Sequence, residues 1–85
     1  MPVRVEFHST IEKRLKKLPK NIQTRFFSIV ERLKINPLAG IPLKGDFEGE
    51  RKYRIGDYRI VYRFFPKDKT VFIYRIESRQ GVYKN

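Results

Sequence analysis

The sequence predicts an α+β fold in which an N-terminal helical hairpin packs on one face of an antiparallel sheet, in the order β-α-α-β-β-β. Apolar residues alternate with polar ones near the N-terminus, recur at helical spacing up to residue 33, and alternate again from residue 51 onward. The first and third patterns are typical of half-buried strands and the second of amphipathic helices. An 85-residue chain is too short to bury two separate cores, so we expect a single domain over residues 1–85.

The N-terminal strand and the first helix are expected within residues 3–18. Val3, Val5 and Phe7 have the period of a strand with one buried face. Ser9 and Glu12 have the spacing of a capping box, in which each side chain bonds the backbone N–H of the other residue. A short helix should therefore follow Ser9 and bury three apolar residues: Ile11, Leu15 and Leu18.

The second helix is marked by a longer apolar stripe. Its apolar residues recur at the spacing of one helix face: Ile22, Phe26, Ile29 or Val30, and Leu33. Asn36-Pro37 ends it, because the residue before a proline avoids helical geometry. Residues 36–50 contain two prolines and three glycines and are expected to form a loop.

Three strands are predicted in the C-terminal half, over residues 51–55, 58–65 and 70–77, with turns at 56–57 and 66–69. Alternation assigns one side of these strands to the helices: Tyr53, Ile55, Tyr58, Ile60, Tyr62, Phe64, Phe72, Tyr74 and Ile76. The other side, which we call the open face, then receives six basic residues: Lys52, Arg54, Arg59, Arg63, Arg75 and Arg79. Side chains on neighbouring strands lie close enough to converge in one groove.

The charge of the chain is strongly positive and unevenly distributed. The formal net charge is +11. Residues 51–85 hold ten basic and three acidic side chains, a net of +7, whereas residues 1–50 have a net of +4. Such a field favours polyanions, either nucleic acid or an acidic protein. Like charges on neighbouring strands repel, so the basic open face indicates an anion site. The alternative is a solvated face that guards the sheet against aggregation.

The same residues carry a resemblance to a known family. The run from Arg51 to Tyr62, RKYRIGDYRIVY, is similar to the central strands of RelE-type toxins, in which a basic-x-basic pair precedes Gly-Asp-Tyr-Arg. The preceding Leu-Lys-Gly at 43–45 and the final Arg-x-x-Val-Tyr at 79–83 resemble the flanking motifs of that family. The likeness covers nearly the whole chain, and the Gly-Asp-Tyr-Arg element is shared across the RelE/ParE superfamily.

The resemblance implies a toxin of a type II toxin–antitoxin system that cleaves mRNA in the ribosomal A site. In that reaction the 2′-hydroxyl attacks its own 3′-phosphate and leaves a 2′,3′-cyclic phosphate, with no metal and no cofactor. Position by position, the implied catalytic residues are Lys52, Arg54, Arg59, Arg79 and Tyr83. Three further cations are expected to bind the RNA backbone: Arg63, Arg75 and Lys44.

Each implied catalytic residue has a chemical role that suits it. Lys52 is the preferred general base, because cationic neighbours favour the neutral form of a lysine, and Arg54 is the alternative. Arg59 is expected to clamp the scissile phosphate with its planar guanidinium. Arg79 would neutralise the leaving 5′-oxygen, and Tyr83 would stack on or orient the neighbouring base.

Three other titratable residues are given structural roles. Some relatives carry a histidine near the C-terminus as general acid, but the single histidine here, His8, is expected at the surface. Glu50 is expected to be a solvated loop carboxylate rather than a general base. Glu77 is expected to be an ion-pair partner of Arg79.

Two other functions are compatible with the sequence. A ParE-like toxin shares the fold and the Gly-Asp-Tyr-Arg element but inhibits DNA gyrase and has no nuclease site. A non-catalytic RNA-binding module would need only the positive charge. Retention of Lys52, Arg54, Arg79 and Tyr83 together favours the nuclease.

The partners and compartment follow from the same observations. The resemblance implies an acidic RelB-like antitoxin, which would cover the open face and neutralise its charge. The chain has no cysteine, which excludes disulfides and thiolate metal sites. No apolar run approaches the roughly 20 residues of a membrane helix, and the first residues lack the apolar stretch of a signal peptide. We therefore expect a cytoplasmic protein.

Overall fold

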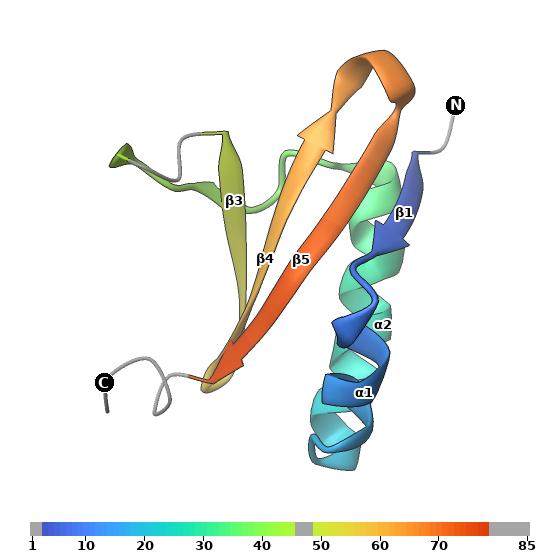
Figure 1. Ribbon diagram of the computed structural model, residues 1–85, viewed down its shortest axis with the longest axis vertical. Helices are drawn as coiled ribbons and strands as arrows, with labels where there is room; N and C mark the ends of the chain where they lie inside the picture. The colour runs from blue at the N-terminus through green and yellow to red at the C-terminus, as the bar shows by residue number, and fades with distance from the viewer. Residues whose placement is uncertain (1–2, 46–48, 79–85) are drawn as a thin grey trace.

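The computed structural model describes residues 3–45 and 49–78 and confirms the α+β class (Figure 1). The elements are β1 (Arg4–Phe7), α1 (Thr10–Lys16), α2 (Lys20–Ile35), β2 (Ile41–Pro42), β3 (Glu50–Ile55), β4 (Tyr58–Phe65), a 3₁₀ turn (Pro66–Asp68) and β5 (Thr70–Ser78). The short β2 lies in the segment expected to be a loop. Within the described ranges, no helix has the length and apolarity needed to cross a bilayer.

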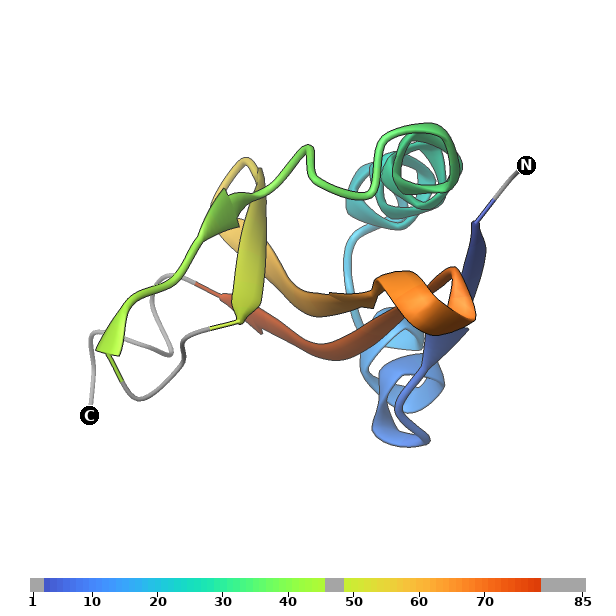
Figure 2. The ribbon, with the colours of Figure 1, turned by 90° about the horizontal axis from the view of Figure 1, so that it is seen from above.

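The five strands form one sheet in the order β1-β5-β4-β3-β2. Three of the four pairings are antiparallel, but β1 runs parallel to β5, so the sheet is mixed rather than wholly antiparallel as predicted. A parallel pair requires a long crossover connection. The two helices and three intervening strands supply it here. Figure 2 shows the β1 edge and the β2 edge at opposite ends of the sheet, with β4 and β5 between them.

The second helix follows the predicted apolar pattern, whereas α1 ends at Lys16 and buries Ile11, with Leu15 and Leu18 only partly buried against the core. In α2 the buried residues are those of the expected stripe: Ile22, Phe26, Ile29, Val30 and Leu33. The helix ends at Ile35, directly before Asn36-Pro37. At the start of α1 the predicted capping box is absent, since Ser9 makes no side-chain cap bond. The Nδ1 atom of His8 instead accepts the Thr10 N–H at 3.2 Å, which satisfies one of the unpaired N–H groups at the helix start.

A single apolar cluster joins both helices to one face of the sheet. The helices contribute Ile11 and the buried residues of α2, and the sheet contributes Ile55, Ile60, Tyr62, Val71, Ile73 and Ile76. The side chains of Leu33, Ile55 and Ile60 in this cluster are completely buried. Burial of this cluster provides the main stabilisation of the fold.

The alternation predicted for β5 is wrong over its first half. Val71 and Ile73 are completely buried in the core, whereas Phe72 and Tyr74 are partly exposed and lie on the open face. The cause is a β-bulge. Val61 pairs with Arg75 and Tyr62 with Ile73, so one extra residue, Tyr74, stands between two successive pairs. A bulge reverses the alternation at that point, and for this reason Arg75 and Ile76 still occupy the predicted sides.

The side chain of Tyr62 links the sheet to the loop that follows α2 through hydrogen bonds. Its ring is completely buried. Its hydroxyl donates a hydrogen bond to the Pro37 carbonyl (2.9 Å) and accepts one from the Gly40 N–H (2.8 Å). Arg51, the cross-strand neighbour of Tyr62, donates to the Gly40 carbonyl at 2.8 Å. Burial raises the pKa of Tyr62 above its ordinary value of 10.0, although the Gly40 hydrogen bond and the charge of Arg51 act in the opposite direction.

The stability of the fold should therefore decline in alkali. The unfolded chain releases the Tyr62 proton near pH 10, while the folded chain keeps it. The stabilisation is complete below the unfolded-state pKa and is lost as the pH rises toward the folded-state pKa, with a slope of up to about 1.4 kcal/mol per pH unit. Urea titrations at about pH 9 and about pH 11 should show a steeper loss for the wild type than for Tyr62→Phe. Equal losses in the two proteins would contradict this assignment.

Candidate nucleic-acid interface

The open face brings together the basic residues of three strands. Across β3 and β4, Arg54 lies directly opposite Arg59, and Lys52 lies opposite Val61. Across β4 and β5, Arg59 lies opposite Glu77, and Val61 lies opposite Arg75. One more pair of β3 and β4 completes the face, Glu50 with Arg63. The predicted sharing of one face is thus confirmed for Lys52, Arg54, Arg59, Arg63 and Arg75.

Two carboxylates, Glu77 and Glu50, lie among these cations and form a network with Arg59 and Arg75. The Oε1 atom of Glu77 accepts the Nε–H of Arg59 at 2.8 Å, and its Oε2 accepts the Nε–H of Arg75 at 3.1 Å. Arg75 continues toward β3, where its Nη2 lies 3.7 Å from Oε1 of Glu50. Across β3, β4 and β5, the described part of this face therefore carries five cations and two anions, a net of +3 rather than an uncompensated positive cluster.

The structure corrects the role predicted for Glu50 and adds to the role predicted for Glu77. Glu50 is not a solvated loop residue. It is the first residue of β3, and its side chain is only 14% exposed. Glu77 is an ion-pair partner as predicted, but the partners that the structure shows are Arg59 and Arg75. The alternation of side chains along the strands could have placed both carboxylates. Residues two apart in a strand lie on the same face, so Glu50 lies on the face of Lys52, and Glu77 on the face of Arg75.

The other predicted residues lie in four different settings. Lys52 is half-buried and Arg54 exposed, and within residues 3–45 and 49–78 the structure shows no ion pair for either. The guanidinium of Arg63 lies close to Gly49, where an added Cβ would be 3.3 Å from Cζ. Lys44 is exposed in the connection between β2 and β3. Arg79 and Tyr83 lie outside the described residues.

Aromatic side chains on the open face were assigned to the core by the sequence. Phe72 and Tyr74 contact each other with ring centroids 4.9 Å apart, at an interplanar angle of 54°. Phe72 also lines a hollow of about 240 Å³ with Phe65, Arg4 and Glu6. Exposed aromatic faces beside cations are suited to stacking with unpaired bases. The bulge at Tyr74 is what places them there.

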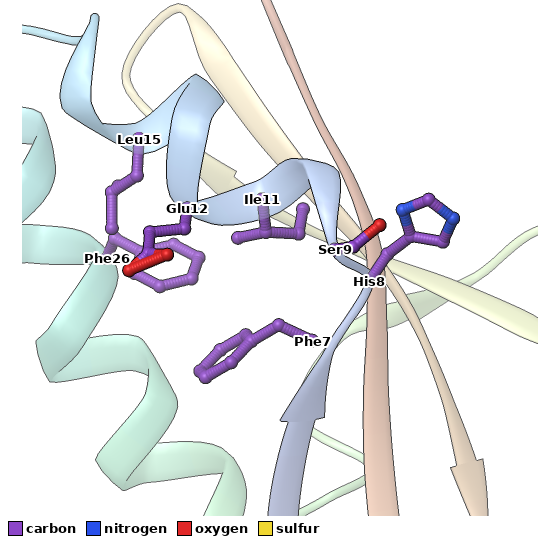
Figure 3. Close-up of a pocket in the computed structure, with 7 residues that line it drawn as sticks. All are labelled: Phe7, His8, Ser9, Ile11, Glu12, Leu15 and Phe26. Atoms are coloured by element: carbon purple, nitrogen blue, oxygen red, sulfur yellow. The ribbon is translucent and has the colours of Figure 1, made fainter.

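A second pocket, of about 330 Å³, lies where β1, α1 and α2 meet (Figure 3). It is lined by Phe7, His8, Ser9, Ile11, Glu12, Leu15 and Phe26. Phe7 pairs with Ile73, a core residue, so this pocket belongs to the helix side of the sheet and is separate from the open face. Across the described residues, no group of three or more His, Asp or Glu side chains is placed to hold a metal ion.

The sequence was compared with known protein families. Residues 5–83 match the family described as the ParE toxin of the type II toxin–antitoxin system parDE. The chain is also similar to a putative toxin RelE1 from Methanocaldococcus jannaschii. The two are 37% identical over 90 residues, which span 100% of this chain and 99% of that protein.

Two solved structures with the same fold are complexes of a toxin with its antitoxin. One is the RelBE2 complex of Mycobacterium tuberculosis, with a TM-score of 0.83 and 33% identity over 93% of this chain and 100% of the matched chain. Another is the archaeal RelE–RelB complex of Pyrococcus horikoshii OT3, with a TM-score of 0.79 and 30% identity over 93% of this chain and 97% of the matched chain.

Proposed function

The chain belongs to the RelE/ParE superfamily, the toxins of type II toxin–antitoxin systems, and from that membership we propose that it is a ribosome-dependent mRNA endoribonuclease. The observation that supports this function best is the direct pairing of Arg54 with Arg59, beside Lys52, on the open face. Three cations on two adjacent strands form a surface on which the phosphate of an RNA strand would be held from more than one side.

The proposed reaction needs stabilisation of negative charge more than any covalent help from the protein. The 2′-oxygen forms a bond to phosphorus, the bond from phosphorus to the 5′-oxygen breaks, and a 2′,3′-cyclic phosphate remains. Charge gathers on the phosphoryl oxygens in the transition state, where preorganised cations are most effective. Arg59 would bind these oxygens, and Lys52 would accept the proton of the 2′-hydroxyl, with Arg54 as the alternative acceptor.

The last step of the reaction depends on residues at the C-terminus. The leaving 5′-oxygen must gain a proton or a compensating charge. By family resemblance, Arg79 would supply it, and Tyr83 would orient the base beside the cut. The route proposed here involves no metal ion.

We also propose an acidic RelB-like antitoxin as the partner of this toxin. The net charge of +11 would attract an acidic protein as well as RNA. The solved relatives support the proposal, since both were crystallised as complexes with a RelB-type protein. An antitoxin that covers Arg54 and Arg59 would block access of RNA to the open face.

Purified protein added to a translation extract should cut mRNA that is being translated. Primer extension on the extracted mRNA is expected to show new 5′ ends within the coding region, in phase with codons. The same mRNA with its start codon removed is the control, and it should stay intact because its coding region is not on ribosomes. Absence of codon-phased cuts would contradict the proposal.

The ParE family match supports a second candidate, inhibition of DNA gyrase without nuclease activity. A supercoiling assay with relaxed plasmid distinguishes the two functions. A nuclease of the proposed kind should leave gyrase activity unchanged, whereas a gyrase inhibitor should block supercoiling and leave the mRNA in the extract intact.

A further inference from the structure

We infer that Glu77 is a positioning residue that fixes the guanidinium groups of Arg59 and Arg75 in the orientation that an RNA phosphate requires. The inference rests on the proposed nuclease function and deepens it. Glu77 uses its two oxygens for two different arginines, Oε1 for Arg59 and Oε2 for Arg75. One carboxylate therefore bridges two cations on neighbouring strands that would otherwise repel each other.

The atoms that make these contacts decide how each arginine is presented. Glu77 accepts the Nε–H of Arg59, so the bond engages the inner edge of the guanidinium. The terminal Nη atoms, which make the bidentate contact to a phosphate, are left at the outer end. Among the described residues, the structure shows Glu77 as the one partner of Arg59. The bond thus orients the side chain without occupying the nitrogens that would bind RNA.

Arg75 is held in a similar way and from both ends. Its Nε–H is bonded to Glu77, and its Nη2 lies 3.7 Å from Glu50 on β3. The side chain spans the completely buried Val61, which lies opposite it on β4. Glu77 is 25% exposed and Glu50 only 14%, so both carboxylates lie low on the face, while Arg59 and Arg75 are 34% and 41% exposed. The two carboxylates therefore lie closer to the sheet, and the two arginine side chains extend further toward solvent.

A positioning role for Glu77 and a purely electrostatic role predict different results when its charge is removed. Removing one negative charge raises the net charge of the described face, so binding of RNA should become tighter if only charge matters. If Glu77 sets the orientation of Arg59, its loss should slow cleavage even though RNA still binds. A misplacement of a catalytic cation by about 1 Å can reduce a rate by about 100-fold.

The test compares Glu77→Gln with Glu31→Gln on ribosomes programmed with a single defined mRNA. Glu31 lies exposed on α2, where it pairs with Lys34, so its variant changes the net charge equally and also breaks one surface ion pair. We expect Glu77→Gln to lower the single-turnover cleavage rate at saturation by about 10- to 100-fold. For Glu77→Gln, the concentration of programmed ribosomes that gives half of the maximal cleavage rate should stay the same or fall. Glu31→Gln should match the wild type in its cleavage rate.

A third variant, Glu77→Asp, tests the position of the carboxylate separately from its charge. It keeps both oxygens but shortens the side chain, so its rate should lie between those of the wild type and Glu77→Gln. Thermal unfolding of all variants checks that the fold is kept. A Glu77→Gln rate equal to or above the wild-type rate would overturn the inference alone. A wild-type protein that leaves the mRNA uncut would overturn the proposed function, and the positioning role with it.

Discussion

Replacing Gly40 with alanine should lower the free energy of unfolding by about 3 kcal/mol or more. The new Cβ would lie 2.7 Å from the Tyr62 hydroxyl and 2.8 Å from the backbone oxygen of Lys52. Neither contact is easily relieved, because the ring is buried in the core and the backbone oxygen belongs to β3, which is paired on both sides, with β2 and β4. The clash would also break the hydrogen bond from the Gly40 N–H to Tyr62.

Gly45→Ala is the matched control for this substitution. Gly45 has a φ of +73°, and an added Cβ there would have no atom within 4 Å, so the change introduces backbone strain without a clash. Its expected cost is about 1 to 2 kcal/mol. Urea unfolding of both variants measures the difference. Equal losses would show that the packing of Gly40 against Tyr62 does not limit stability.

A double variant separates the two atoms of the clash. Adding Tyr62→Phe to Gly40→Ala removes the hydroxyl at 2.7 Å but keeps the ring atom Cε1 and the Lys52 oxygen, both at 2.8 Å. The effects of the two substitutions on the free energy of unfolding should therefore be non-additive. Tyr62→Phe should cost less in the Gly40→Ala background than in the wild type.

Arg59→Ala should reduce the rate of mRNA cleavage by about 100- to 1000-fold, the effect of removing one preorganised group that stabilises transition-state charge. Arg59 lies opposite Arg54 on one side and Glu77 on the other, at the centre of the open face. Its loss removes the proposed phosphate clamp and leaves Glu77 to pair with Arg75 alone. Cells that express this variant should keep growing where the wild type arrests them.

Two further variants separate charge from geometry at this position. Arg59→Lys keeps the charge but loses the Nε–H and the planar fork, so it should recover part of the lost rate. Arg32→Ala removes the same charge from an exposed position on α2 and should cleave as the wild type does. Quantitative primer extension gives the three rates. Full activity of Arg59→Ala would remove the basis for assigning the clamp to this side chain.

Much of this fold is predictable from local patterns. The apolar stripe of α2 and the break at Asn36-Pro37 predict the extent of this helix to within a few residues. The Gly56-Asp57 turn gives the register of β3 and β4, and the facing of Lys52, Arg54 and Arg59 follows from it. In each case, residues close in sequence determine the geometry, which is why pattern and structure agree.

The failures occur where the determining partner is distant or the pattern carries no information. Residues 71–74, Val-Phe-Ile-Tyr, are apolar at every position, so the sequence does not show which of them face the core. Their sides are set by the bulge in the pairing with Val61 and Tyr62. The parallel pairing of β1 with β5 joins segments more than sixty residues apart, as Arg4 and Thr70 show. Neither feature has a local signature.

The candidate site was predictable in its cations and incomplete in its anions. Alternation placed Lys52, Arg54, Arg59, Arg63 and Arg75 on one face, as observed. The carboxylates were missed for different reasons. The proline- and glycine-rich segment ending at residue 50 hid the start of β3 at Glu50. For Glu77, only Arg79, which lies outside the described residues, was considered as a partner, although side chains across strands are as close as neighbours along them.

The parallel pairing of β1 with β5 also determines when the molecule can assemble during its synthesis. β1, the first of the described strands to be made, pairs with β5, the last of them, with Phe7 opposite Ile73. Three residues of the core, Val71, Ile73 and Ile76, belong to that same strand. The nascent chain therefore lacks both the pairing partner of β1 and part of its core until the ribosome has made β5. A protein proposed to attack translating ribosomes thus depends on a ribosome to complete β5 before it can reach this fold.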